Sequence, residues 1–121
     1  MDLNVYQDKA METCMPSCDN FSYMMLNLMG ELGEFASKVG KAIRKEEMFI
    51  GINAPNRLAL HDNMDVQMLD ELKAEAGDIL WQLSGLCKVM GWRLEDVAQC
   101  NLAKLASRAQ RGVIDGSGDN R

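Results

Sequence analysis

Two long segments of this chain carry apolar residues at the spacing of a single helix face. The first lies within residues 21–47 and the second within residues 65–90; together they comprise Phe21, Met25, Leu28, Leu32, Phe35, Ala36, Val39 and Ile43, then Met68, Leu72, Ala76, Ile79, Leu83, Leu86 and Met90. Residues three and four positions apart share one face of an α-helix, so each segment predicts a long amphipathic helix. Shorter helices are expected at residues 3–13 and 94–111. Asp19 or Asn20 should cap the second helix, and Gly91 and Gly112 should end the third and fourth.

The composition agrees with an all-α fold. The 121 residues include ten Met but only seven aromatic residues, and 47% are apolar. Aromatic and β-branched residues are typical of strands, so this balance favours helices. We therefore predict an antiparallel helical bundle of about four helices forming one domain over residues 1–121, with a flexible tail at residues 110–121. A loop is expected at residues 50–56, and Leu58–Leu60 could form a helical turn.

Charge and hydropathy exclude several classes of partner. The net charge is −5 and the pI is about 4.8, which is unfavourable for binding nucleic-acid polymers. No apolar run approaches the roughly 20 residues needed to cross a bilayer, and no signal-peptide pattern is visible. We expect a cytoplasmic protein without membrane association. The cysteines should be reduced, mostly packed thiols: Cys14, Cys18, Cys87 and Cys100.

Two pairs of carboxylates lie at the margins of the two long apolar faces, each pair at i, i+3 spacing. The four residues are Glu31, Glu34, Glu75 and Asp78. Four carboxylates at a helix–helix contact repel one another and resist burial unless a cation joins them, and Mg²⁺ prefers such oxygen ligands. The alternative is ordinary ion pairing at the boundary, for example between Glu34 and Lys38. Two matched pairs, each with a glycine (Gly33 or Gly77) before its last carboxylate, favour the metal. These glycines could also let the two helices approach closely.

The fourth helix carries polar residues on its apolar side. Asn101 and Arg108 project there, with Lys104 at the edge. A buried arginine without a partner is costly, so Arg108 should face an anion. Either the four carboxylates or a bound phosphate would serve. Trp81 and Trp92 are weaker candidates for stacking on a base; packing is expected for Trp92 and a subunit interface for Trp81.

Around these carboxylates and the polar residues of the fourth helix, the chain resembles the MazG-like all-α nucleoside triphosphate pyrophosphohydrolases of the small phage or bacterial type. The family pattern is E-x-x-E on one helix followed by E-x-x-D on the next. The similar blocks are residues 28–35, residues 75–83, residues 101–105 with Arg108, and the tail at residues 111–121. The resemblance implies a helical protomer that completes its core as a homodimer or a dimer of dimers.

The resemblance also implies a site and a reaction. Glu31, Glu34, Glu75 and Asp78 would ligate Mg²⁺, with Mn²⁺ as an alternative ion. Lys104 and Arg108 would contact the phosphates, with Asn101 supporting the site. Lys38 is a further candidate because of its position, and the chemistry of the reaction calls for one carboxylate, such as Glu34, to orient the attacking water or take its proton. The hydrolase would cleave the α–β phosphoanhydride bond of a (d)NTP, giving (d)NMP and pyrophosphate, as in nucleotide-pool cleansing.

Two other classes of protein are alternatives to this enzyme. A non-enzymatic helical adaptor would bind partner helices through its Met-rich faces. A di-iron carboxylate bundle would use Glu-x-x-His motifs, but His61, the single histidine of the chain, lies outside both carboxylate pairs.

Overall fold

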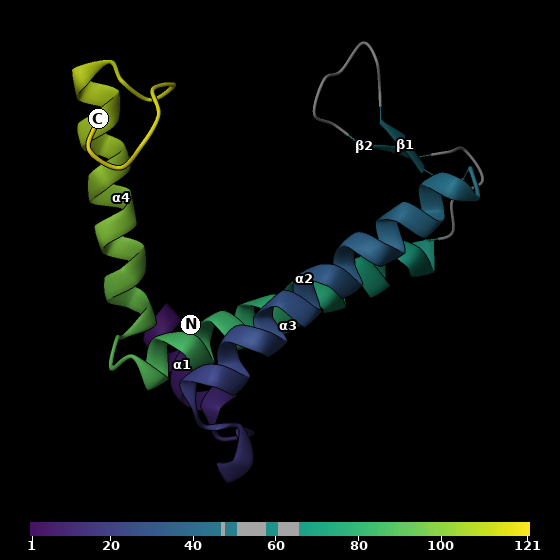
Figure 1. The fold of residues 1–121 in the computed structure, drawn as a ribbon, viewed down its shortest axis with the longest axis horizontal. Helices are drawn as coiled ribbons and strands as arrows, with labels where there is room; N and C mark the ends of the chain where they lie inside the picture. Colours follow the sequence, from purple (N-terminus) through teal and green to yellow (C-terminus); the bar gives the residue numbers. More distant parts are fainter. Residues whose placement is uncertain (47, 51–57, 61–65) are drawn as a thin grey trace.

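The computed structural model describes residues 1–46, 48–50, 58–60 and 66–121 (Figure 1). Its elements, in chain order, are helix α1 (Leu3–Met11), the 3-10 turn η1 (Pro16–Cys18), helix α2 (Phe21–Arg44), strands β1 (Met48–Ile50) and β2 (Leu58–Leu60), and helices α3 (Val66–Val89) and α4 (Leu94–Arg111). The all-α prediction is confirmed, and the four helices start and end close to the residues predicted from sequence. None of the described helices is long and apolar enough to cross a bilayer.

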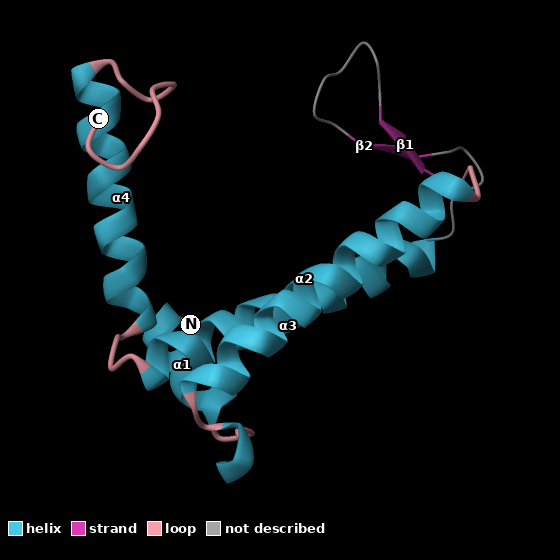
Figure 2. Cartoon of the chain, in the orientation of Figure 1, coloured by secondary structure: helices cyan, strands magenta, loops and turns pink. Residues whose placement is uncertain are grey.

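Helices α2 and α3 form an antiparallel hairpin, which is the main body of the molecule (Figure 2). As predicted, Asn20 caps α2: its Oδ1 accepts a hydrogen bond of 2.8 Å from the Tyr23 amide. At the other end of the hairpin, α2 and α3 bury Ala42 against Leu72. Other apolar side chains pack around this contact, namely Phe35, Val39 and Met68.

A glycine does allow a close approach, but at a different position from the two predicted. Met24 of α2 is fully buried, and a Cβ on Gly85 of α3 would overlap its side chain. A Cβ on Gly33 or Gly77 would instead meet open space, so the predicted role of these two glycines is wrong. Gly85 therefore permits this contact between α2 and the second half of α3.

A small β-hairpin lies between α2 and α3. Strands β1 and β2 pair antiparallel, with Met48 opposite Leu60 and Ile50 opposite Leu58. The helical turn considered for Leu58–Leu60 is therefore wrong. An isolated helical turn orders several residues for one hydrogen bond, whereas pairing with β1 bonds the backbone directly. Most of the predicted loop, residues 51–56, lies outside the described residues.

Helix α3 ends at Gly91, as predicted, and the chain turns there into α4. Gly91 has φ 76°, and its amide donates to the carbonyl of Lys88 at 2.9 Å. The next amide, of Trp92, donates to the carbonyl of Cys87 at 2.8 Å. This is the glycine-terminated helix end in which a left-handed residue satisfies the last carbonyls. Gly112 ends α4 in the same conformation, with φ 72°.

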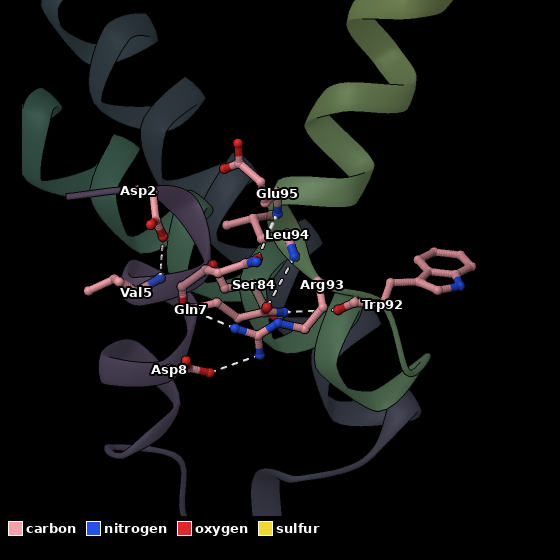
Figure 3. Close-up of polar contacts among 10 residues, drawn as sticks. Asp2, Val5, Gln7, Asp8, Ser84, Trp92, Arg93, Leu94 and Glu95 are labelled. Atoms are coloured by element: carbon pink, nitrogen blue, oxygen red, sulfur yellow. Dashed lines mark hydrogen bonds and ion pairs between the residues drawn. The ribbon is translucent and has the colours of Figure 1, made fainter.

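The buried side chain of Gln7 on α1 ties this turn to the rest of the fold (Figure 3). Its Nε2 donates to the carbonyls of Ser84 at 3.2 Å and Trp92 at 3.1 Å, and its Oε1 accepts from the Leu94 amide at 3.0 Å. Helix α1 thereby holds the start of α4, while the rest of α4 leads away from the α2–α3 hairpin (Figure 1). The predicted bundle is open at this side.

Three packing predictions need correction. Trp81 is held within the chain rather than left for a partner: its Nε1 donates to the Ala10 carbonyl at 3.0 Å and to Thr13 Oγ1 at 2.9 Å. Trp92 was expected to pack, but 51% of it is exposed, because the turn at Gly91 carries its indole outward (Figure 3). All four cysteines are free thiols, yet Cys100 is exposed on α4 rather than packed.

Candidate metal centre and cationic helix

Three carboxylates from the two long helices lie together. Glu31 and Glu34 of α2 and Glu75 of α3 each place one oxygen within 4.8 Å of the others. The i, i+3 spacing puts the first two on one side of α2, and the antiparallel packing of α3 brings Glu75 to them. Asp78 is exposed and lies outside this three-carboxylate group. The structure thus assembles three of the four predicted metal ligands.

Two oxygens of the three-carboxylate group are buried without a hydrogen-bond donor among the described residues. They are Glu31 Oε2 and Glu75 Oε2. A buried carboxylate oxygen without a donor is costly, and a cation would satisfy it. An all-oxygen set of ligands suits a hard ion such as Mg²⁺. The residues present therefore fit a divalent cation.

The electrostatics of the three-carboxylate group are those of excess negative charge. Burial, followed by the charges of Glu34, Asp78 and Glu75, raises the pKa of Glu31 above its ordinary value. Lys38 Nζ lies 2.9 Å from Glu75 Oε1. Its hydrogen bond and charge interaction with Glu75 raise the pKa of Lys38. Lys38 thus pairs across the two helices with Glu75, whereas the sequence alternative paired it with Glu34 along α2.

Two neighbours of this site were not predicted from sequence. Asn27 Nδ2 donates to Glu31 Oε1 at 3.4 Å from one turn earlier on α2, a contact that the i, i+4 spacing signals. Tyr6 of α1 lies near the fourth predicted ligand, Asp78: burial, followed by the charge of Asp78, raises the pKa of Tyr6. No sequence pattern indicates the position of Tyr6, because it depends on how α1 packs.

The cations of α4 do not face the carboxylates in this structure. Arg108 Nη2 and Lys104 Nζ contact Asp119 Oδ1, at 3.0 Å and 3.4 Å. Arg108 is buried and faces an anion, as its position on the apolar side requires. That anion is a carboxylate of the C-terminal tail, not one of the four predicted partners. Because α4 leads away from the hairpin, a single chain does not bring these cations to the three-carboxylate group (Figure 1).

Asn101 and Lys104 line an open cavity beside the α3–α4 turn. Its volume is about 540 Å³, and the exposed Trp92 forms another part of its wall. An aromatic face, an amide and an ammonium group together offer stacking, hydrogen bonding and positive charge.

The fold and these groups define an all-α protein with a candidate carboxylate-rich cation centre. Residues 20–113 match the MazG nucleotide pyrophosphohydrolase domain, so the chain belongs to this family, as its motifs suggested. The chain is also similar to the Gene 37 protein of Mycobacterium phage L5, with 38% identity over 128 residues covering 100% of both proteins. No solved structure gives a significant match.

Proposed function

We propose that this protein is a metal-dependent nucleoside triphosphate pyrophosphohydrolase. It would cleave the α–β phosphoanhydride bond of a (d)NTP, releasing a (d)NMP and pyrophosphate. The observation that carries the proposal is the meeting of Glu31, Glu34 and Glu75 from two helices, with two buried oxygens for which the described part of the chain supplies no donor. Membership of a nucleotide pyrophosphohydrolase family supports a nucleotide as the substrate of this arrangement.

In this proposal the carboxylates have two roles, binding the metal ion and accepting a proton from the attacking water. Glu31 and Glu75, the less exposed members, would hold Mg²⁺ or Mn²⁺, with Asp78 as a further ligand. When bound, the ion would neutralise phosphate charge and lower the pKa of a water molecule. Glu34 is exposed at the edge of the group, where it can orient that water and accept its proton. Lys38, already at 2.9 Å from Glu75, would contact a phosphate oxygen.

The cations of α4 would serve the same reaction in an oligomer. We assign Lys104 and Arg108 to the phosphates, and the cavity lined by Trp92 and Asn101 to the nucleoside. A second copy would supply them, since α4 leads away from its own hairpin. Exposed apolar side chains on α2 and α4 support a homodimer or a dimer of dimers. They are Leu26, Met29 and Leu32 on α2, and Leu102 and Leu105 on α4.

The test is a panel of NTPs and dNTPs with Mg²⁺ or Mn²⁺, with products separated by ion-exchange chromatography. We expect monophosphate and pyrophosphate from at least one substrate, and their absence across the panel would refute the proposal. Glu75→Gln should abolish turnover while the helical circular dichroism is kept. Asp70→Asn is the matched control, because Asp70 is an exposed carboxylate of α3 outside the three-carboxylate group. A helical adaptor predicts neither hydrolysis nor any effect of metal.

A further inference from the structure

The C-terminal tail folds back along α4 as a loop closed by its last residue (Figure 1). The Arg121 guanidinium donates to the carbonyls of Val113 at 2.9 Å, Ile114 at 3.1 Å and Gly118. The carbonyl of Arg121 in turn accepts from Arg111 Nη2 of α4 at 2.8 Å. These bonds tie the end of the chain both to the start of the tail and to the helix.

Glycines make this closed loop possible. A Cβ on Gly116 would lie 2.7 Å from Arg121 Cδ and 3.2 Å from the Val113 carbonyl oxygen, so a larger residue would push the arginine aside. Gly118 has φ 80°, a left-handed conformation that glycine adopts without strain. Gly116 and Gly118 therefore favour this closed conformation of the tail.

The loop presents one carboxylate to the two cations of α4. Asp119 Oδ1 accepts from both Arg108 Nη2 and Lys104 Nζ. The hydrogen bond from Arg108, followed by the charge of Lys104, lowers the pKa of Asp119. The side chain of Asp119 is 84% exposed, whereas that of Arg108 is only 6% exposed. The Arg108 guanidinium is thus held by its surroundings, while the Asp119 carboxylate bound to it is accessible from solvent, where another anion could compete with it.

We propose that Asp119 is an intramolecular stand-in for a phosphate group, which the substrate's polyphosphate must displace from Lys104 and Arg108. This inference rests on the proposed function, which assigns these two residues to the phosphates. Carboxylate and phosphate oxygens compete for the same N–H donors, and two anions do not share them without repulsion. The tail loop would then weaken phosphate binding until a substrate opens it.

The test is binding of inorganic tripolyphosphate to the full chain, by calorimetry at low salt without divalent cations. Asp119→Asn should tighten binding about threefold, as expected for loss of a competing ion pair that is exposed at one end. Asp115→Asn is the matched control: Asp115 lies in the same exposed tail but makes no ion pair among the described residues, so binding should not change. Arg121→Ala, which opens the loop but keeps Asp119, should also tighten binding, by less.

A Lys104→Gln change made together with Asp119→Asn should remove the gain in affinity, because it removes one of the two competing donors. Unchanged or weaker binding by Asp119→Asn would overturn the inference, as would equal tightening by Asp115→Asn, which would reflect net charge alone. Hydrolysis assays separate this from the proposed function. A chain that hydrolyses NTPs without responding to Asp119→Asn refutes only the inference. A chain that responds but does not hydrolyse refutes only the enzymatic activity.

Discussion

Replacing Glu31 by glutamine should stabilise the metal-free protein and at the same time remove most of its response to Mg²⁺. Glutamine keeps the size of the side chain and an oxygen to accept from Asn27 Nδ2. It removes one of three negative charges whose oxygens lie within 4.8 Å of one another. The buried Oε2 of Glu31, which has no donor among the described residues, is then no longer part of a charged group.

The gain without metal follows from Coulomb's law. Two unit charges at 4.8 Å repel by about 0.9 kcal/mol in water and by about 3.5 kcal/mol at an effective dielectric constant near 20. The group is partly open and Lys38 offsets some of its charge, so we take the low end, a net gain of about 1 kcal/mol. An unfolding entropy of about 2.1 cal/mol/K per residue over 121 residues converts this gain into a Tm rise of about 4 °C.

With metal present, the substitution should have the opposite effect, because it removes most of the stabilisation that the ion provides. An ion at 100 times its Kd stabilises the wild-type protein by about 2.7 kcal/mol, which corresponds to a Tm rise of about 11 °C. Loss of a direct ligand should weaken binding by at least about 100-fold, the upper end of what outer-shell partners of a metal cost. The same Mg²⁺ concentration would then raise the Tm of Glu31→Gln by only about 2 °C.

The assay is scanning calorimetry near pH 7, with EDTA and with Mg²⁺, on the wild-type protein and Glu31→Gln. The control is Glu12→Gln, a loss of charge at an exposed glutamate of the α1 end, outside the three-carboxylate group. The control should respond to Mg²⁺ as the wild-type protein does. The reasoning fails if Glu31→Gln is no more stable than wild type in EDTA, or if Mg²⁺ raises its Tm by as much.

Four further outcomes are expected. Because the pKa of Glu31 is raised in the folded state, protonation of Glu31 stabilises the fold. This stabilisation of the wild-type protein is present below about pH 4.5 and is lost as the pH rises through the raised pKa. In EDTA, the Tm advantage of Glu31→Gln over wild type should therefore grow over that pH range. Gln7→Ala removes two buried hydrogen bonds and one partly buried one, and should lower the stability by about 2–3 kcal/mol, measured by urea unfolding. Gly85→Ala should cost about 1–3 kcal/mol by overpacking against Met24, and the same change should cost less in a chain that already carries Met24→Ala. Trp92→Ala should leave the Tm nearly unchanged but raise the KM for a nucleoside triphosphate roughly tenfold if its exposed ring stacks on the base, and an unchanged KM would exclude this role.

Local signals in the sequence were sufficient for the helices. The apolar spacing, the Asn20 cap and the glycines at 91 and 112 each act within a few residues, so they do not depend on how the helices pack. The meeting of Glu31, Glu34 and Glu75 needed only one more fact, that two long helices that follow one another in the chain pack antiparallel. The spacing of carboxylates on each single helix was therefore enough to predict a contact between the carboxylates of α2 and α3.

Contacts that depend on helix rotation or on distant segments were beyond the sequence. Which glycine of α3 faces α2 depends on a rotation of a few tens of degrees, and Gly85 rather than Gly77 occupies that position. Trp81 looked like an interface residue because α1, which accepts its Nε1–H, is a separate segment of the chain. The pairing of Leu58–Leu60 with β1 likewise depends on a partner strand rather than on its own residues.

The direction of α4 is the feature on which the rest of the site depends, and it comes from long-range contacts. A helical wheel correctly placed Arg108 on the buried side, but a wheel does not say which group lies opposite. The side chain of Gln7 donates hydrogen bonds to carbonyls 77 and 85 residues away in the chain. These bonds hold the start of α4 so that the helix leads away from the hairpin, and they thereby decide which groups lie near Arg108. Closing a short loop costs less entropy than closing a long one, so Arg108 pairs with Asp119, 11 residues further on, rather than with a carboxylate of α2. Lys104 and Arg108, on a helix that leads away from its own core, are thereby paired with a carboxylate of the chain's own tail, and this is the ion pair that a phosphate group would have to displace.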